Sequence, residues 1–176
     1  MKQVKKYSVC AVVLLLILVF MNSLFARALL HLIHFNVGVD GDNVVSSITY
    51  GRHGYEMILK GNGYMTPNFP EEWQGELVNL SSGWKIALKK VSVQDGISSL
   101  PSGIFSGCSK LGYVQLPSSL QIIGMKAFSY CYELKAIEYD GTIDEWINLA
   151  NNSPLWNDES FVNVIQCANG EWYVGE

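Results

Sequence analysis

Residues that commonly carry catalysis are scarce in this sequence. There are three histidines, His31, His34 and His53, and all lie in the first third of the chain. His31 and His34 have the spacing of metal ligands, but they lie close to a predicted cleavage site, in a segment that we expect to be frayed. The sequence contains neither a nucleophile elbow nor a phosphate-binding glycine loop. We therefore expect no enzyme activity, no cofactor and no bound metal.

The start of a calcium loop is present without its end. Asp40-Gly-Asp42-Asn43 is similar to the opening of such a loop, but the twelfth position is Gly51. A calcium loop needs a bidentate glutamate at that position. The segment is therefore not expected to bind calcium.

Basic residues are also few. The chain has 12 Lys and Arg against 16 Asp and Glu, a net charge of −4. Loss of residues 1–28 would remove four basic and no acidic residues, which leaves a net charge of −8. A nucleic-acid partner requires a basic surface, so none is expected. The same charge disfavours peripheral binding to an anionic membrane.

Cysteines are too few, and odd in number, for a disulfide scaffold. Cys10 lies within an apolar run, which leaves Cys108, Cys131 and Cys167. An exported chain with three cysteines keeps at least one thiol or forms an intermolecular bond.

The N-terminus has the pattern of a signal peptide. Lys2, Lys5 and Lys6 precede an uninterrupted apolar run from Val9 to Met21, and Ala26-Arg-Ala28 follows. This run is long enough for a signal peptide and short for a membrane span. We predict cleavage after Ala28, with Ala26 as the second choice. The alternative is an uncleaved anchor from Val9 to about Phe25; both interpretations place the rest of the chain outside the cytoplasm.

A short pattern repeats along the middle of the chain with a period of 23. A shift by one period places Phe105 on Phe128, Cys108 on Cys131 and Leu111 on Leu134, and it aligns segments 88–93, 111–116 and 134–139. Each segment ends in an apolar–polar–apolar alternation, which is typical of a strand with one buried face. The period lies within the range of about 20–29 residues of leucine-rich repeats, whose strands stack into a parallel sheet.

The rest of each coil supplies core residues. We expect Phe105 and Phe128 in the core, and Ile97/Leu100 with Leu120/Ile123 on a second, shorter edge. Cys108 and Cys131 would be stacked and buried. A disulfide between them is sterically conceivable, but two buried thiols are favoured because stacked side chains point in parallel.

Both ends of the repeats carry elements that could cap them, as a short array requires. Towards the N-terminus, strand-like runs Val44–Tyr50 and Tyr55–Lys60 flank the turn-rich segment 51–54. Towards the C-terminus, Thr142–Glu145 forms a capping box that opens a short amphipathic helix. The predicted apolar residues of this helix are Trp146, Ile147, Leu149 and Ala150.

A second hairpin is predicted after the helix. Runs 161–167 and 171–174 flank Asn169-Gly170, a favoured hairpin turn. Trp146, Trp156 and Trp172 would seal the open end of the array; as an alternative, exposed tryptophans would form a binding surface.

The predicted fold is therefore α/β and β-rich: a short leucine-rich-repeat solenoid between an N-terminal hairpin cap and a C-terminal cap of a helix and a hairpin. The expected divisions are residues 1–28 as signal peptide, 29–84 as N-terminal β cap and loop, 85–140 as repeats and 141–176 as C-terminal cap.

The repeat units resemble a known family. Segments 103–111 and 126–134 are similar to the "AFxxCxxL" core of BspA-type leucine-rich repeats, although Gly103-Ile104 replaces the usual alanine position. Segment 139–146 is similar to the "YxGTxxxW" element that often follows the last repeat. The resemblance covers roughly residues 40–176. It implies a surface protein that adheres to host proteins or other cells.

The candidate binding residues are those that point outward from stacked strands. Two rows are expected: Lys90, Tyr113 and Ala136, then Ser92, Gln115 and Glu138. Tyr113 is the candidate anchor, because aromatic residues with a polar tip dominate recognition hot spots. The hypothesis is an exported, non-catalytic module that binds a protein or a glycan. Two alternatives stay open: a solvated sheet face without ligand, and an accessory subunit that docks a larger surface protein through its C-terminal cap.

Overall fold

The computed structural model describes residues 33–36, 38, 43–51, 54–65 and 87–175. The predicted signal peptide, His31, His53 and most of the segment similar to a calcium loop lie outside these residues. Among the described residues are the following elements: β1 (Ile33–Asn36), β2 (Val45–Gly51), β3 (Gly54–Lys60), β4 (Leu88–Val93), β5 (Ser99–Leu100), β6 (Tyr113–Leu116), β7 (Ile122–Ile123), β8 (Ala136–Tyr139), α4 (Ile143–Asn151), β9 (Val164–Cys167) and β10 (Gly170–Tyr173). No helix in this part of the chain has the length and apolar character that crossing a membrane requires.

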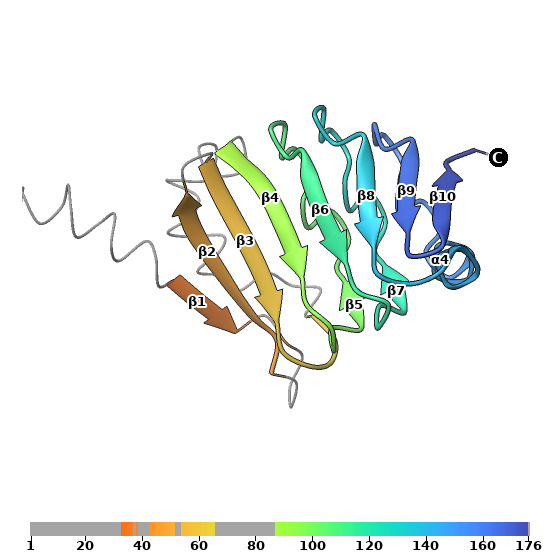
Figure 1. Ribbon diagram of the computed structural model, residues 1–176. Coiled ribbons are helices and arrows are strands. Elements are labelled where there is room, and N and C mark those ends of the chain that lie inside the picture. The colour runs from red at the N-terminus through yellow and green to blue at the C-terminus, as the bar shows by residue number, and fades with distance from the viewer. Residues whose placement is uncertain (1–32, 37, 39–42, 52–53, 66–86, 176) are drawn as a thin grey trace, which may run out of the picture.

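Eight strands form one sheet in the order β1-β2-β3-β4-β6-β8-β9-β10. The pairs at both ends are antiparallel, whereas β3, β4, β6, β8 and β9 run parallel to one another. The short strands β5 and β7 pair separately and in parallel. Figure 1 shows the eight strands side by side in this order, with α4 beside β10.

The strands of the central coils pair at a constant sequence distance. Val91 pairs with Val114, and Gln115 pairs with Glu138, so each residue meets its equivalent one period later. The same distance joins Leu100 to Ile123 on the short second sheet. Each coil therefore places its residues directly against their equivalents in the next coil.

The core lies between the main sheet and the return path of each coil. The side chains of Phe105 and Phe128 are fully buried, and their rings stack with centroids 5.6 Å apart. Cys108 and Cys131 are also fully buried as thiols, and the Cys131 thiol donates a hydrogen bond to the carbonyl of Phe105 at 3.2 Å. The predicted core positions of these four residues are confirmed. Burial of this apolar surface is the main force that holds the coils together.

One glycine lets two coils approach each other closely. A Cβ atom on Gly124 would lie 2.2 Å from the Ser102 nitrogen and 2.5 Å from the Pro101 carbonyl carbon. The Gly124 N–H also donates to the Leu100 carbonyl at 2.8 Å. Any side chain here would have to displace backbone, so the contact requires glycine.

The helix α4 begins as the sequence predicts. The Thr142 side chain accepts a hydrogen bond from the Glu145 N–H, and the Glu145 carboxylate accepts one from the Thr142 N–H at 2.7 Å. The buried face of the helix consists of Trp146 and Leu149. Ile147, which the sequence places among the apolar residues of the helix, is instead 38% exposed, because it follows Trp146 directly and lies about 100° around the helix from it.

Tryptophans fill the space beneath α4. Trp146 is fully buried and meets the Trp156 ring at 5.3 Å in a nearly perpendicular contact. Trp172 is partly buried and lies 6.3 Å from Trp146. The side chains of Trp146 and Trp156 are therefore core residues and are not exposed for docking.

Two local expectations were wrong. The segment around His34 was expected to be frayed, but His34 belongs to β1, where it pairs with Ser47 of β2. The C-terminal hairpin turns at Ala168-Asn169, one residue before the predicted Asn169-Gly170, since Gly170 pairs with Cys167. Hydrogen bonds to the start of α4 explain this shift: Asn169 Oδ1 accepts from the Ile143 N–H, and the Ala168 N–H donates to the Gly141 carbonyl.

Candidate binding surface on the main sheet

Alternation along the parallel strands divides buried from outward residues. In β4, β6 and β8 the apolar side chains that face the core are buried, and those between them are half-buried. All six predicted site residues belong to this half-buried set. Lys90 pairs with Tyr113, and Gln115 pairs with both Ser92 and Glu138. Ala136 lies one period after Tyr113 and pairs with Val164 of β9.

The two rows extend beyond the predicted residues. Glu56 and Ile58 of β3 pair with Lys90 and Ser92, and Gln166 of β9 pairs with Glu138. We call these ten residues the sheet face: Glu56, Lys90, Tyr113, Ala136, Val164, Ile58, Ser92, Gln115, Glu138 and Gln166. The contributions of β3 and β9 were missed because these strands lie outside the repeating pattern.

Tyr113 is held from both sides. The Lys90 ammonium lies over its ring, 4.4 Å from the centroid, and its hydroxyl donates a hydrogen bond to Glu138 Oε2 at 2.5 Å. This hydrogen bond, partial burial and the charges of Glu138 and Asp140 raise the pKa of Tyr113 to about 12. The phenol therefore stays protonated at physiological pH, with its ring fixed between strands β4 and β8.

A second hydrogen bond links the rows to the end of β8. The Gln115 amide nitrogen donates to Asp140 Oδ1 at 3.2 Å. The sheet face and this neighbour together carry Glu56, Glu138 and Asp140 against one lysine, Lys90. The surface is therefore preordered and acidic, which suits a partner with basic groups.

An aromatic cluster borders the sheet face at the loops before β8 and β9. The rings of Tyr132 and Phe161 lie 5.0 Å apart, and the Lys135 ammonium lies 4.9 Å from the Phe161 centroid. Tyr132 is 53% exposed and Phe161 42%. This cluster was not predicted from the sequence, although a signal was present: Tyr132 follows the buried Cys131 and must point away from the core.

Ion pairs connect residues of different coils. Glu133 contacts Lys110 at 2.7 Å and Lys89 at 3.5 Å, and Lys126 contacts Asp158 and Glu159. These groups are exposed, so each pair adds little to stability. Within the described ranges, no three His, Cys, Asp or Glu residues come together as potential metal ligands.

The repeats match a known family. A family model described as a BspA-type leucine-rich repeat region of six copies matches residues 83–153. The crystal structure of a leucine-rich repeat protein from Eubacterium ventriosum is similar over 61% of this chain, with 19% sequence identity and a TM-score of 0.39. The match spans 30% of the length of that protein. No curated protein matches the chain.

Proposed function

Because residues 83–153 form a BspA-type leucine-rich repeat region, we propose that this chain is a protein-interaction module whose partner binds the sheet face. It acts by binding and not by catalysis. The observation that carries this proposal is the fixed position of Tyr113, between the Lys90 ammonium and the Glu138 carboxylate. An aromatic residue that is already ordered loses little side-chain freedom when a partner covers it.

The charge of the sheet face indicates the chemistry of the partner. Glu56, Glu138 and the adjacent Asp140 outnumber Lys90. A basic, polar protein segment would complement the charge of this face. Electrostatic attraction would also bring such a segment towards the face before the two are in contact. We therefore propose a protein partner with lysine or arginine side chains opposite Glu138 and Asp140.

Export is the second part of the proposal. It is supported by the basic start, the apolar run Val9–Met21 and Ala26-Arg-Ala28. The module would then act in adhesion at or outside the cell surface, with segments 29–84 and 141–176 as caps on the repeats of 85–140. Mass spectrometry of the exported protein should find an N-terminus at Leu29 or Arg27. Intact Met1 on a membrane-integrated protein would support the anchor instead.

The binding site is tested with a partner isolated by pull-down on the exported chain. Its affinity is measured for the wild type and for the variants Tyr113→Ala and Gln115→Ala. Loss of a hot-spot tyrosine costs about 2 kcal/mol, roughly 30-fold in Kd. The matched control is Ile122→Ala, which removes a 41% exposed side chain from the separate short sheet.

The variants separate binding from folding. The proposal expects weaker binding for Tyr113→Ala and Gln115→Ala, while both variants stay folded at the assay temperature, as shown by an unchanged circular dichroism spectrum, and unchanged binding for Ile122→Ala. Wild-type affinity in both sheet-face variants would refute this location for the binding site.

A further inference from the structure

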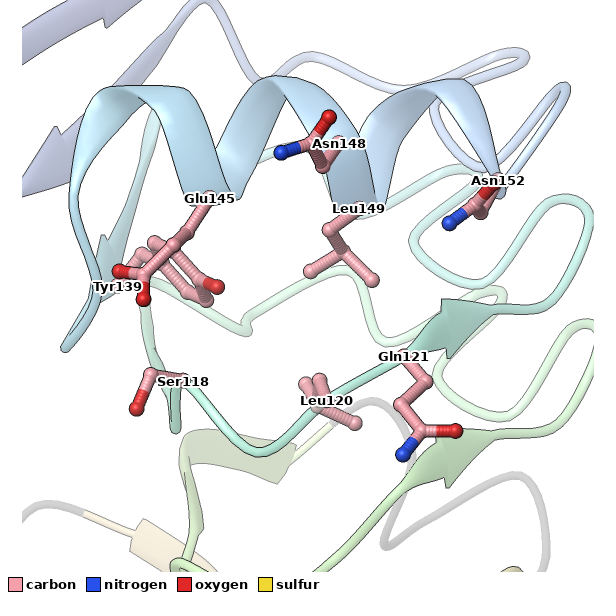
Figure 2. A pocket seen from close by; sticks show the side chains of 8 residues that line it. All are labelled: Ser118, Leu120, Gln121, Tyr139, Glu145, Asn148, Leu149 and Asn152. Carbon is pink, nitrogen blue, oxygen red and sulfur yellow. The ribbon is translucent and has the colours of Figure 1, made fainter.

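A groove of about 400 Å³ lies between α4 and the segment 118–121, on the opposite side of β8 from the sheet face. Figure 2 shows Glu145 and Leu149 of α4 pointing towards Tyr139 and Leu120 across the groove. Leu120 and Leu149 are buried and form an apolar floor. Its volume lies within the range of small-molecule sites.

Tyr139 provides a polar group inside this groove. Its side chain is only 3% exposed and lines the groove beside Glu145. Within the described residues, the Tyr139 hydroxyl has no hydrogen-bond partner. The hydroxyl oxygen is not among the fully buried polar atoms that lack a partner, so it keeps contact with the solvent in the groove. A ligand with a hydrogen-bonding group at this point would take the place of that solvent.

Amide side chains form the rim. Gln121 lies on one wall, and Asn148 and Asn152 lie on the opposite wall, four residues apart on one face of the helical segment. Each amide offers both donors and acceptors. The Tyr64 hydroxyl donates to Gln121 Oε1 at 2.7 Å, which fixes the orientation of that amide.

The charge of the groove excludes one class of ligand. Among the described residues that line the groove, Glu145 is the only charged one, and its hydrogen bond from the Thr142 backbone N–H lowers its pKa. It is therefore ionised at neutral pH. A phosphate or carboxylate ligand would be repelled by Glu145 and would meet no basic group among the described lining residues.

We propose that this groove binds one sugar residue of an uncharged glycan. Sugar hydroxyls donate and accept hydrogen bonds at once, as the amides of the rim and the Tyr139 hydroxyl require. The C–H face of a sugar ring fits the floor of Leu120 and Leu149. The site uses the inward side of β8 and is independent of the sheet face.

The test uses the full chain and simple glycosides as probes: the methyl glycosides of mannose, galactose, glucose and N-acetylglucosamine, with glucuronic acid as the anionic comparison. Binding is followed by saturation-transfer and chemical-shift NMR up to about 20 mM, since single sugars commonly bind with millimolar Kd. At least one neutral glycoside should bind, and glucuronic acid should bind more weakly. Tyr139→Phe, which removes only the hydroxyl, should weaken binding at least about tenfold.

Two further variants test whether the sugar binds in the groove. Asn148→Ala removes an exposed amide from the rim and should also weaken binding. Tyr113→Phe changes the sheet face alone and should leave sugar binding unchanged, which separates this proposal from the preceding one. If Tyr139→Phe alters the fold, Asn148→Ala decides the outcome. The proposal is overturned if no neutral glycoside binds, or if Asn148→Ala binds as tightly as the wild type.

Discussion

Truncation of Phe128 to alanine should remove a large part of the stability of the repeat array. Phe128 is fully buried. Its ring stacks on Phe105 at 5.6 Å and meets the edge of Trp156 at 6.3 Å, so it joins one coil to the next and to the tryptophans under α4.

The size of the effect follows from these contacts. Removal of a buried phenylalanine side chain costs about 3–5 kcal/mol. The two ring contacts, each worth about 0.5–1.5 kcal/mol beyond the buried area, place Phe128→Ala in the upper half of that range. Domains are stable by only about 5–15 kcal/mol. The measurement is urea unfolding followed by circular dichroism, with the free energy extrapolated to water.

The matched control is Phe161→Ala, the same chemical change at a side chain that is 42% exposed. It should cost about 1 kcal/mol or less. A loss below about 1 kcal/mol for Phe128→Ala would mean that the two phenylalanines do not form the core of adjacent coils, and the repeat register would be wrong.

Three further changes have defined outcomes. Gly124→Ala should destabilise by at least about 1–3 kcal/mol because its Cβ would meet backbone, whereas Gly112→Ala, which meets nothing within 4 Å, should not. Thr142→Ala should cost about 0.5–2 kcal/mol at neutral pH, and less as pH falls through the lowered pKa of Glu145; an equal cost at all pH values would contradict the hydrogen bond that the Thr142 hydroxyl donates to the Glu145 carboxylate. The raised pKa of Tyr113, about 12, adds stability that is complete below about pH 10 and is lost as pH rises towards 12. Tyr113→Phe should therefore lose less stability than the wild type over this interval, and parallel curves in urea unfolding would refute the assignment.

The repeat could be predicted because the apolar character of its recurring residues indicates that they are buried. The pair Phe105 and Phe128 and the pair Cys108 and Cys131 are separated by the same number of residues. Apolar side chains that recur with a constant sequence period indicate a core that is built from repeated coils. The capping box of α4 could also be predicted, because Thr142 and Glu145 are only three residues apart and interact within one helical turn.

Features that depend on contacts between distant segments could not be predicted. The groove joins α4 to segment 118–121, and the position of α4 follows from the packing of Trp146 against Trp156. The turn at Ala168-Asn169 is shifted by hydrogen bonds to the start of α4. The strand β1 carries no repeat, and the chain between it and its partner β2 has no periodic pattern that would indicate their pairing.

Site-specific crosslinking tests the central claim, that a protein partner binds the sheet face, most directly. A photoreactive residue replaces Gln166, which is exposed and pairs with Glu138 in the sheet face, or Ile122 on the separate short sheet. With the partner obtained by pull-down, residue 166 should give a crosslinked product that Tyr113→Ala suppresses, and residue 122 should give none. A crosslink from residue 122, with none from residue 166, would contradict the claim.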